Sequence, residues 1–343
     1  MFDSITSLSD FFFDPDRISF AILAMLLCMV VGMITGPLAN NINPLSWIVF
    51  DMVFGRIGSR LDRSTRMTAD LVLRGMILTF VSLFLIYVLG LQMVKLVATQ
   101  PFYGLTEVVL LSLTMTGGSV WYSLLKLYFA LGKNAVSKGS YLTIARSTRN
   151  DLNTSDNFGV TRVGMGMSAM VISRGLIGPV LWYFIAGLPG AYIYALLAML
   201  SWRFGKEGFT KGFGRLPLAL ERLLGFIPDM LAGTLISMAG LFTPTGTMTK
   251  ALLAQMFGRK QAKYDQGGKG ITALAFALKV SLGGPISDLD GSVIKRDWIG
   301  PDGATAKLEA GHLKRAIYIN FVTYILFMAS LVSAILWSGI LPG

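Results

Sequence analysis

The sequence predicts an all-α fold: a polytopic helical membrane protein with about six spans and two partial or re-entrant elements on the cytoplasmic side. Of its 343 residues, 53% are hydrophobic and only 14% are charged, whereas about a quarter of the residues in soluble domains are charged. The mean hydropathy is +0.62. Apolar blocks recur from residue 18 to residue 340 without a long polar interval, so residues 1–343 are predicted to form a single integral membrane domain.

The apolar blocks have room for six helical spans, since about 20 apolar residues are needed to cross the hydrocarbon core. The block at residues 163–204 is long enough for two helices, and Leu188-Pro189-Gly190, a typical turn sequence, divides it. It therefore predicts a tight helical hairpin. Each of the other four blocks predicts one span, and these lie at residues 18–39, 75–97, 105–131 and 316–341.

The charges of the connecting segments predict how the spans are oriented. The segments that follow the first span, the third span and the hairpin are rich in Lys and Arg, whereas residues 98–104 and 188–190 contain neither. The positive-inside rule places the basic segments in the cytoplasm and the acidic segment 1–17 outside. That segment lacks the basic start of a signal peptide, so the first span is predicted to be retained. We expect a multi-pass protein of the bacterial inner membrane with its N-terminus outside.

The net charge of +11 is spread over many loops between the spans. This distribution is typical of basic cytoplasmic loops that face anionic lipid head groups. The lipid bilayer is therefore a predicted partner, and nucleic acid is not.

Two apolar segments within the cytoplasm-side region 205–312 do not fit a simple crossing. Residues 226–242 are apolar but have basic residues on both sides, and residues 271–282 are too short to span and end in Gly283-Gly284-Pro285. We interpret both as partial elements that enter the membrane or pack against the bundle. Irregular backbone at that depth is tolerated only where it is buried in protein or lines a cavity. A cytoplasm-facing cavity is therefore predicted.

Few residues suggest chemistry on their own. The single His312 excludes a multi-histidine metal site, and the single Cys28 excludes an internal disulfide. Arg174 lies in the middle of an apolar block. Such an arginine is either structural, paired with a carboxylate or carbonyl group, or a donor to phosphate or another anion. Glu221 and Arg222, just before the first partial element, are either a solvated helix entry or part of the cavity.

The order of several short motifs is more specific than any one of them. They are Asn43-Pro44-Leu45-Ser46-Trp47-Ile48, Gly187-Leu188-Pro189-Gly190-Ala191, Gly225-Phe226-Ile227-Pro228, Leu282-Gly283-Gly284-Pro285 and Asp297-Trp298-Ile299-Gly300. This series, over roughly residues 20–335, resembles the CobD/CbiB family, the membrane proteins of cobalamin biosynthesis. The resemblance implies an adenosylcobinamide-phosphate synthase, which joins adenosylcobyric acid to an aminopropanol phosphate with ATP and a divalent metal.

The motif positions that supply acidic and amide groups in that family differ here. The family's Glu-Asn and Asp-Gly correspond to Met170-Val171 and Arg174-Gly175, and its paired aspartates correspond to Glu221-Arg222. Among the acidic positions only Asp151 keeps its identity, and Glu221 keeps its charge. The glycines and prolines of the scaffold persist. Replacing a carboxylate with an arginine removes a Mg²⁺ ligand and adds repulsion toward the metal.

Two hypotheses follow from the resemblance. In the first, an altered synthase uses Asp151 and Glu221 as catalytic, metal-holding residues and ATP and Mg²⁺ as cofactors. Its substrate- and phosphate-binding residues would be Arg162, Arg174, Arg222 and Asp265. In the second, the chain is a non-catalytic relative similar to the AmpE proteins, whose Ser-Arg-Asn-Asp run resembles Thr148-Arg149-Asn150-Asp151. It would serve as a membrane sensor, binding protein or partner subunit for a corrinoid or another membrane protein.

Overall fold

The computed structural model describes residues 15–340, except for positions 64, 133–137, 154, 206–211, 245–246, 259, 290 and 292. It confirms an all-α, polytopic helical membrane protein. Four described helical segments are long and apolar enough to cross a bilayer, namely Asp16–Thr35, Thr68–Thr99, Asn157–Phe204 and Ala310–Trp337. Counting the bent pair Arg215–Leu224 and Phe226–Phe242 as one span gives five. The total of about six spans stays a prediction, and most of the acidic segment 1–17 falls outside the described residues.

The predicted span at residues 105–131 is not one helix, and that expectation was wrong. It consists of α6 (Tyr103–Ser112) and α7 (Gly118–Gly132), both packed along α2 (Pro15–Thr35). The backbone between them is held by distant partners. The Ser46 N–H donates to the Leu113 carbonyl at 2.9 Å, and the Thr116 N–H donates to the Gly175 carbonyl at 2.8 Å. These long-range bonds replace helical ones, which lets an apolar segment break inside the bundle.

The predicted hairpin at residues 163–204 is confirmed. Helix α9 (Asn157–Val171), the π-helix η3 (Ile172–Ile177) and α10 (Gly178–Phe204) follow one another, but the backbone leaves helical geometry at Ala186 and Gly187. A Cβ placed on Gly178 would overlap the ring of Tyr194, although a straight helix would hold these residues about 24 Å apart. The chain therefore reverses at Gly187, immediately before Leu188-Pro189-Gly190.

The segments between the first spans contain short elements. After α2 come the 3₁₀-helix η1 (Leu38–Asn40), α3 (Leu45–Phe50), the π-helix η2 (Asp51–Gly55) and α4 (Arg56–Leu61). The long helix α5 (Thr68–Thr99) packs against α10, and α8 (Lys138–Thr148) packs against α7 and α9.

The two predicted partial elements correspond to α12 and α14. The C-terminal half contains α11 (Arg215–Leu224), α12 (Phe226–Ala239), η4 (Gly240–Phe242), α13 (Met248–Phe257), η5 (Tyr264–Gln266) and α14 (Gly268–Leu278). Helix α11 meets the α12–η4 segment at a bend of 57°. Helix α14 is short, apolar and largely buried against α12 and α13. How deeply either element enters a bilayer stays a prediction.

Four two-residue strands follow α14 and precede the last helix, α15 (Ala310–Ile340). Strand β1 (Leu282–Gly283) pairs antiparallel with β4 (Trp298–Ile299), and β2 (Ile286–Ser287) pairs antiparallel with β3 (Val293–Ile294). The strand pairs bring together the two motifs that carry the most specific part of the family resemblance.

Buried polar groups fix α15 within the bundle. The Trp121 indole N–H donates to Asn320 Oδ1 at 2.6 Å, and Asn320 Nδ2 donates to the Ser168 carbonyl at 2.8 Å. The Tyr324 hydroxyl donates to the Met25 carbonyl at 2.6 Å. One face of α15 is thus joined to α7, α9 and α2, while its other face exposes apolar side chains.

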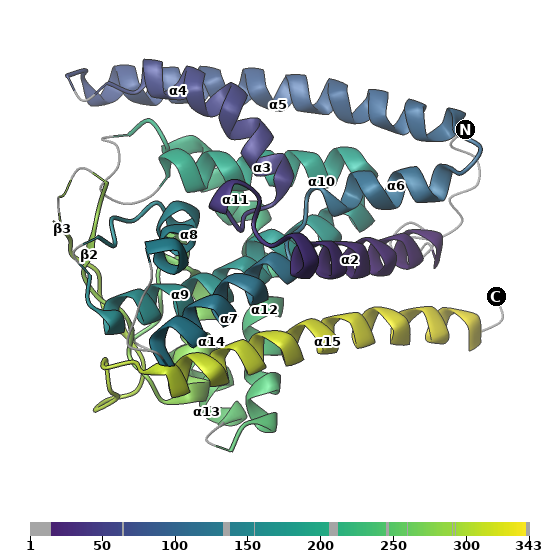
Figure 1. The fold of residues 1–343 in the computed structure, drawn as a ribbon. Helices are drawn as coiled ribbons and strands as arrows, with labels where there is room; N and C mark the ends of the chain where they lie inside the picture. Colours follow the sequence, from purple (N-terminus) through teal and green to yellow (C-terminus); the bar gives the residue numbers. More distant parts are fainter. Residues whose placement is uncertain are drawn as a thin grey trace.

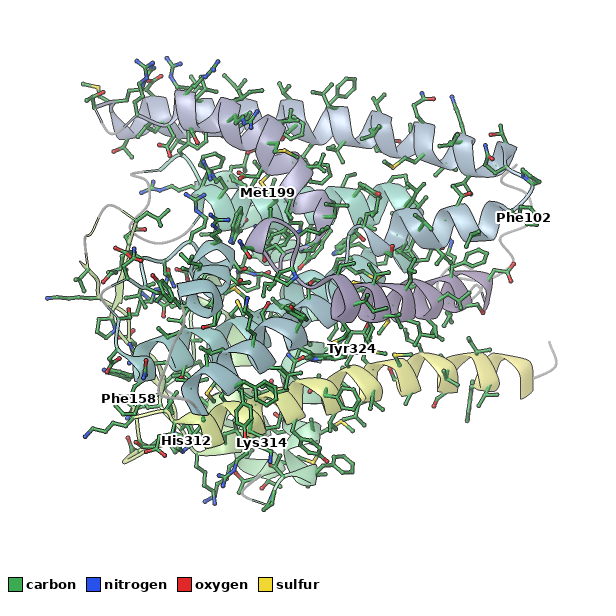
Figure 2. The ribbon with its side chains drawn as sticks, viewed as in Figure 1. Phe102, Phe158, Met199, His312, Lys314 and Tyr324 are labelled. Atoms are coloured by element: carbon green, nitrogen blue, oxygen red, sulfur yellow. The ribbon has the colours of Figure 1, made fainter. Side chains whose placement is uncertain are left out.

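The basic loops gather at one end of the molecule. The beginning of α2 and the end of α15 lie at one end, whereas the α4–α5 connection, α8 and strands β2 and β3 lie at the other (Figure 1). The side-chain view places Phe102 at the first end and His312 and Lys314 at the second (Figure 2). This separation agrees with the alternation of basic and uncharged connections in the sequence.

Gly187 is a direct test of the hairpin, because its φ of 64° and ψ of −157° suit glycine alone. Gly187→Val is expected to lower the free energy of unfolding by about 1–3 kcal/mol, measured by denaturation in detergent. Gly311→Ala is the matched control, since a Cβ there meets no atom within 4 Å. Equal stability of the two variants would contradict a reversal at Gly187.

Candidate functional site

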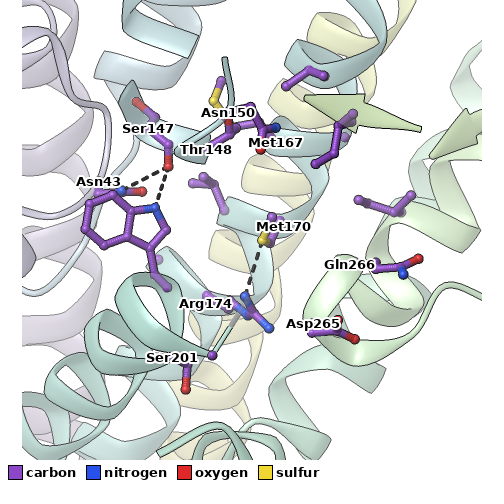
Figure 3. Close-up of a pocket in the computed structure, with 18 of the residues that line it drawn as sticks. Asn43, Ser147, Thr148, Asn150, Met167, Met170, Arg174, Ser201, Asp265 and Gln266 are labelled. Carbon is purple, nitrogen blue, oxygen red and sulfur yellow. Dashed lines mark hydrogen bonds between the residues drawn. The ribbon is translucent and has the colours of Figure 1, made fainter. Parts of the chain in front are cut away.

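A pocket lies where the hairpin, the break between α6 and α7 and the β1 loop converge. It encloses about 1030 Å³ of empty space, its open mouth included. Its apolar lining includes Trp47, Met167 and Met170, and its polar lining comes from distant parts of the chain (Figure 3). The polar and charged lining residues are Asn43, Thr116, Ser147, Thr148, Asn150, Arg162, Arg174, Ser201, Asp265, Gln266 and Arg296.

Arg174 reaches the pocket from the π-helix η3. A π-helix frees a backbone carbonyl from the regular pattern, and such turns are frequent at functional sites. The Gly175 carbonyl accepts from the Thr116 N–H, so the irregular turn of η3 fits against the break between α6 and α7. A Cβ on Gly175 would collide with the Thr116 side chain. Glycine at 175 therefore permits the contact that places Arg174.

Arg174 is held by a buried cluster. Its Nε lies 3.1 Å from Glu221 Oε1, and its Nη2 donates to the Tyr264 carbonyl at 2.9 Å. The Tyr264 hydroxyl donates to Glu221 Oε1 at 2.6 Å, and the guanidinium lies 4.7 Å from the centre of the Tyr264 ring. Arg174 is 7% exposed and Glu221 is 0% exposed. Arg174 thus makes the contacts with a carboxylate and a carbonyl group that the structural alternative predicts.

Arg174 also keeps a donor for the pocket. Among the described residues, its Nη1 donates only to the Met170 sulfur, at 3.4 Å, and a thioether is a weak acceptor. Burial raises the pKa of Tyr264 well above its usual value, and the nearby Glu221 carboxylate raises it further. Tyr264 therefore remains a neutral donor to Glu221 and does not compete for the arginine.

Arg162 is positioned by the two most specific motifs. Its Nη2 donates to the Pro285 carbonyl at 3.3 Å, and its guanidinium lies 4.8 Å from the centre of the Trp298 ring. Gly284 has a φ of 72°, and a Cβ there would overlap the Trp298 ring. One wall of the pocket is therefore formed by two motifs, Leu282-Gly283-Gly284-Pro285 and Asp297-Trp298-Ile299-Gly300. Together they position Arg162.

Several pocket residues were not predicted from the sequence. Arg296 lines the pocket one residue before the Asp-Trp-Ile-Gly motif, where the basic pair Lys295-Arg296 is the signal that could have indicated it. At the opposite wall, Asn43 Nδ2 and the Trp202 indole N–H both donate to the Ser147 carbonyl, at 3.3 and 2.7 Å (Figure 3). No local pattern marks Ser147.

The structure brings together three of the six predicted site residues. Arg162, Arg174 and Asp265 line the pocket, and Glu221 is buried behind Arg174. Asp265 is the single carboxylate among the described lining residues.

The other two predicted residues lie elsewhere. Asp151 lines a neighbouring cavity, where its carboxylate accepts from the backbone and side-chain amides of Asn153. Arg222 is exposed and is absent from the pocket lining. Asp151 and Glu221 are therefore not brought together.

The donor set does not fit a metal held by protein carboxylates. The part of the chain that the structure describes contains no group of three or more His, Cys, Asp or Glu side chains suited to a metal ion. Mg²⁺ requires oxygen ligands, and three guanidinium groups at the lining repel it. Guanidinium groups are instead suited to bidentate recognition of phosphate or carboxylate.

Loss of the buried carboxylate is expected to be costly, because it leaves Arg174 charged and without its counter-ion. Glu221→Gln should lower the free energy of unfolding by about 3–5 kcal/mol, measured by denaturation in detergent. The double variant Arg174→Met/Glu221→Met removes both charges and should lose less than the sum of the single variants. Asp70→Asn, in the solvent-exposed pairs with Arg66 and Arg74, is the control and should change stability far less. Additive losses at the buried pair would contradict this account.

Comparison with known proteins agrees with the motif order. The family model of CobD/Cbib protein matches residues 22–320. A probable cobalamin biosynthesis protein CobD of Methanocaldococcus jannaschii is 24% identical over 273 residues, which cover 76% of this chain and 85% of that protein.

Two bacterial relatives match over shorter stretches. The cobalamin biosynthesis protein CobD of Rhodobacter capsulatus is 28% identical, with 53% of this chain and 56% of that protein covered. The CobD of Brucella anthropi is 29% identical, with 38% and 40% covered. No solved structure matches significantly. The family match spans most of the chain and includes every wall of the pocket, and the chain belongs to the CobD/CbiB family.

Proposed function

We propose that this protein acts in cobalamin biosynthesis by binding a phosphate-bearing substrate of the adenosylcobinamide-phosphate synthase type in the arginine-lined pocket. We further propose that it has lost the metal-dependent step. The observation that carries the proposal is the lining itself, whose described residues include three arginines, Arg162, Arg174 and Arg296, and one carboxylate, Asp265.

The recognition chemistry follows from these side chains. Guanidinium groups bind phosphate oxygens through parallel N–H donors, and such charge-assisted bonds are roughly twice as strong as neutral ones. Met170 stands where the family resemblance places an acid, and among the described residues its sulfur is the one acceptor that Arg174 Nη1 reaches. A ligand phosphate would supply the missing acceptor. The apolar lining residues Trp47, Met167 and Met170 suit a less polar part of the ligand.

A retained synthase is the second candidate function, and Asp265 is the observation that favours it. Mg²⁺ is often bound through one or two carboxylates together with substrate phosphates. Asp265 lines the pocket and has no ion pair with another described residue. In that case ATP and Mg²⁺ would be required, and Asp265 rather than Asp151 or Glu221 would contact the metal.

Complementation separates these two functions. The chain is expressed in a strain that lacks its cobinamide-phosphate synthase and is grown under cobalamin limitation. We expect no rescue despite normal amounts of protein in the membrane. Rescue that is abolished by Asp265→Asn would instead establish the synthase and overturn the loss of the metal-dependent step.

Binding of the phosphorylated substrate can be measured directly. Purified protein is titrated with aminopropanol phosphate and with unphosphorylated aminopropanol. Arg162→Gln is expected to weaken binding of the phosphate ester about tenfold, the effect of one charge-assisted hydrogen bond. Lys314→Gln, at an exposed position on α15, should leave it unchanged. Equal affinity for the two compounds would contradict phosphate recognition.

We also propose that the protein lies in the bacterial inner membrane with the pocket open to the cytoplasm and the N-terminus outside. The distribution of Lys and Arg supports this orientation, since the basic connections lie together at one end (Figure 1). Reporter fusions after Arg63 and after Gln100 should report cytoplasmic and external locations, respectively. The reverse result would overturn the orientation without affecting the ligand.

A further inference from the structure

A second cavity lies beside the pocket, and the proposed function leaves it unexplained. It encloses about 1080 Å³ of empty space, its open mouth included. Asn150 and Trp202 line both cavities, so these residues form a shared wall. The rest of the lining comes from the η1 turn, α8 with the loop that follows it, and the end of α10.

Three arginines face this cavity from different elements. Arg146 lies on α8, Arg149 is the first residue after α8, and Arg203 lies near the end of α10. Arg149 adopts a left-handed backbone conformation with a φ of 55°, and its guanidinium lies 5.4 Å from the centre of the Trp202 ring. The backbone is thus turned at the position that brings Arg149 to the shared wall.

The described lining of the cavity carries more positive than negative charge. The carboxylate nearest to Arg203 is Asp51, at 3.4 Å, and Arg203 also donates to the Ser59 hydroxyl at 2.9 Å. Asp151, the one carboxylate among the described lining residues, accepts from Asn153 rather than pairing with an arginine. Burial and the neighbouring Arg203 lower the pKa of Arg149 to about 10, although Asp51 and Asp288 act in the opposite direction. Three arginines and one carboxylate among the described lining residues leave the cavity wall positively charged, and an anion would be attracted to it.

We propose that this second cavity binds the phosphate group of an anionic ligand through Arg146, Arg149 and Arg203, independently of the first pocket. Guanidinium groups, with their paired N–H donors, suit the oxygens of a phosphate group. The shared chemistry fits either a soluble phosphorylated molecule or the head group of an anionic lipid. The site is separate from the proposed substrate pocket, since none of the three arginines lines that pocket.

The test uses the full chain in phosphatidylcholine nanodiscs, titrated with sodium pyrophosphate at constant ionic strength. The background variant Arg162→Gln/Arg296→Gln removes two of the three arginines of the first pocket, so the part of the remaining binding that depends on Arg146 reports the second cavity. Adding Arg146→Gln is expected to weaken this binding about tenfold. Arg146 is exposed, so its neutralisation leaves the core intact.

An opposite effect distinguishes an anion site from a structural role. Asp151→Asn removes a negative charge from the cavity and should strengthen pyrophosphate binding severalfold. Arg315→Gln, at an exposed position on α15 outside both cavities, should have no effect. The proposal is overturned if the background variant binds no pyrophosphate, if Arg315→Gln weakens binding as much as Arg146→Gln, or if Asp151→Asn weakens it.

Nanodiscs with phosphatidylglycerol identify the source of the phosphate. Competition between this lipid and pyrophosphate would assign the cavity to a lipid head group, and undiminished binding would assign it to a soluble ligand. Because the effect of Arg146→Gln is measured with two of the three first-pocket arginines already replaced, failure of this test is distinct from failure of aminopropanol phosphate binding.

Discussion

The ion pair between Arg174 and Glu221 is the contact on which the arrangement of the site depends. Removing a charge from water costs several kcal/mol even after the protein relaxes, so each member is tolerated only beside the other. The pair joins η3 in the hairpin to α11, and Tyr264 adds η5 through its hydroxyl and its carbonyl. Asp265 and Gln266 follow Tyr264 directly in the chain. Because Tyr264 is held by this pair, both residues are placed at the pocket wall.

Backbone irregularities meet at the same place. The π-helix η3 and the break between α6 and α7 share the hydrogen bond from Thr116 to Gly175, and the Thr116 hydroxyl donates to the Ile42 carbonyl at 2.5 Å. Unpaired backbone groups are costly where water is absent. The two interrupted helices therefore satisfy each other and the loop before α3. A pocket can exist at this depth because its irregular walls are hydrogen-bonded to protein.

The sequence predicted the features that composition controls. Apolar length and loop charge indicated the helical class and the separation of basic from uncharged ends, and Leu188-Pro189-Gly190 indicated the reversal beside Gly187. The break between α6 and α7 was missed although Gly117-Gly118 is a turn signal. The partners that hold it, Ile42 and Gly175, are distant in the chain and could not be predicted. For the same reason, charge alone could not tell that Glu221 neutralises Arg174, nor that Arg296 reaches the pocket while Arg222 does not.

The motifs that identify the family and the residues that would hold a metal serve different physical purposes. Gly283 and Gly284 have positive φ angles. Gly283 pairs with Trp298 across strands β1 and β4, and the Trp298 ring lies against the Arg162 guanidinium. These residues shape the wall and seat a cation whether or not a metal is used. An acid-to-arginine change at position 174 is compatible with the same wall, because Glu221 supplies the counter-charge from α11. The same scaffold can therefore surround either a metal-binding pocket or the anion-binding pocket that we propose.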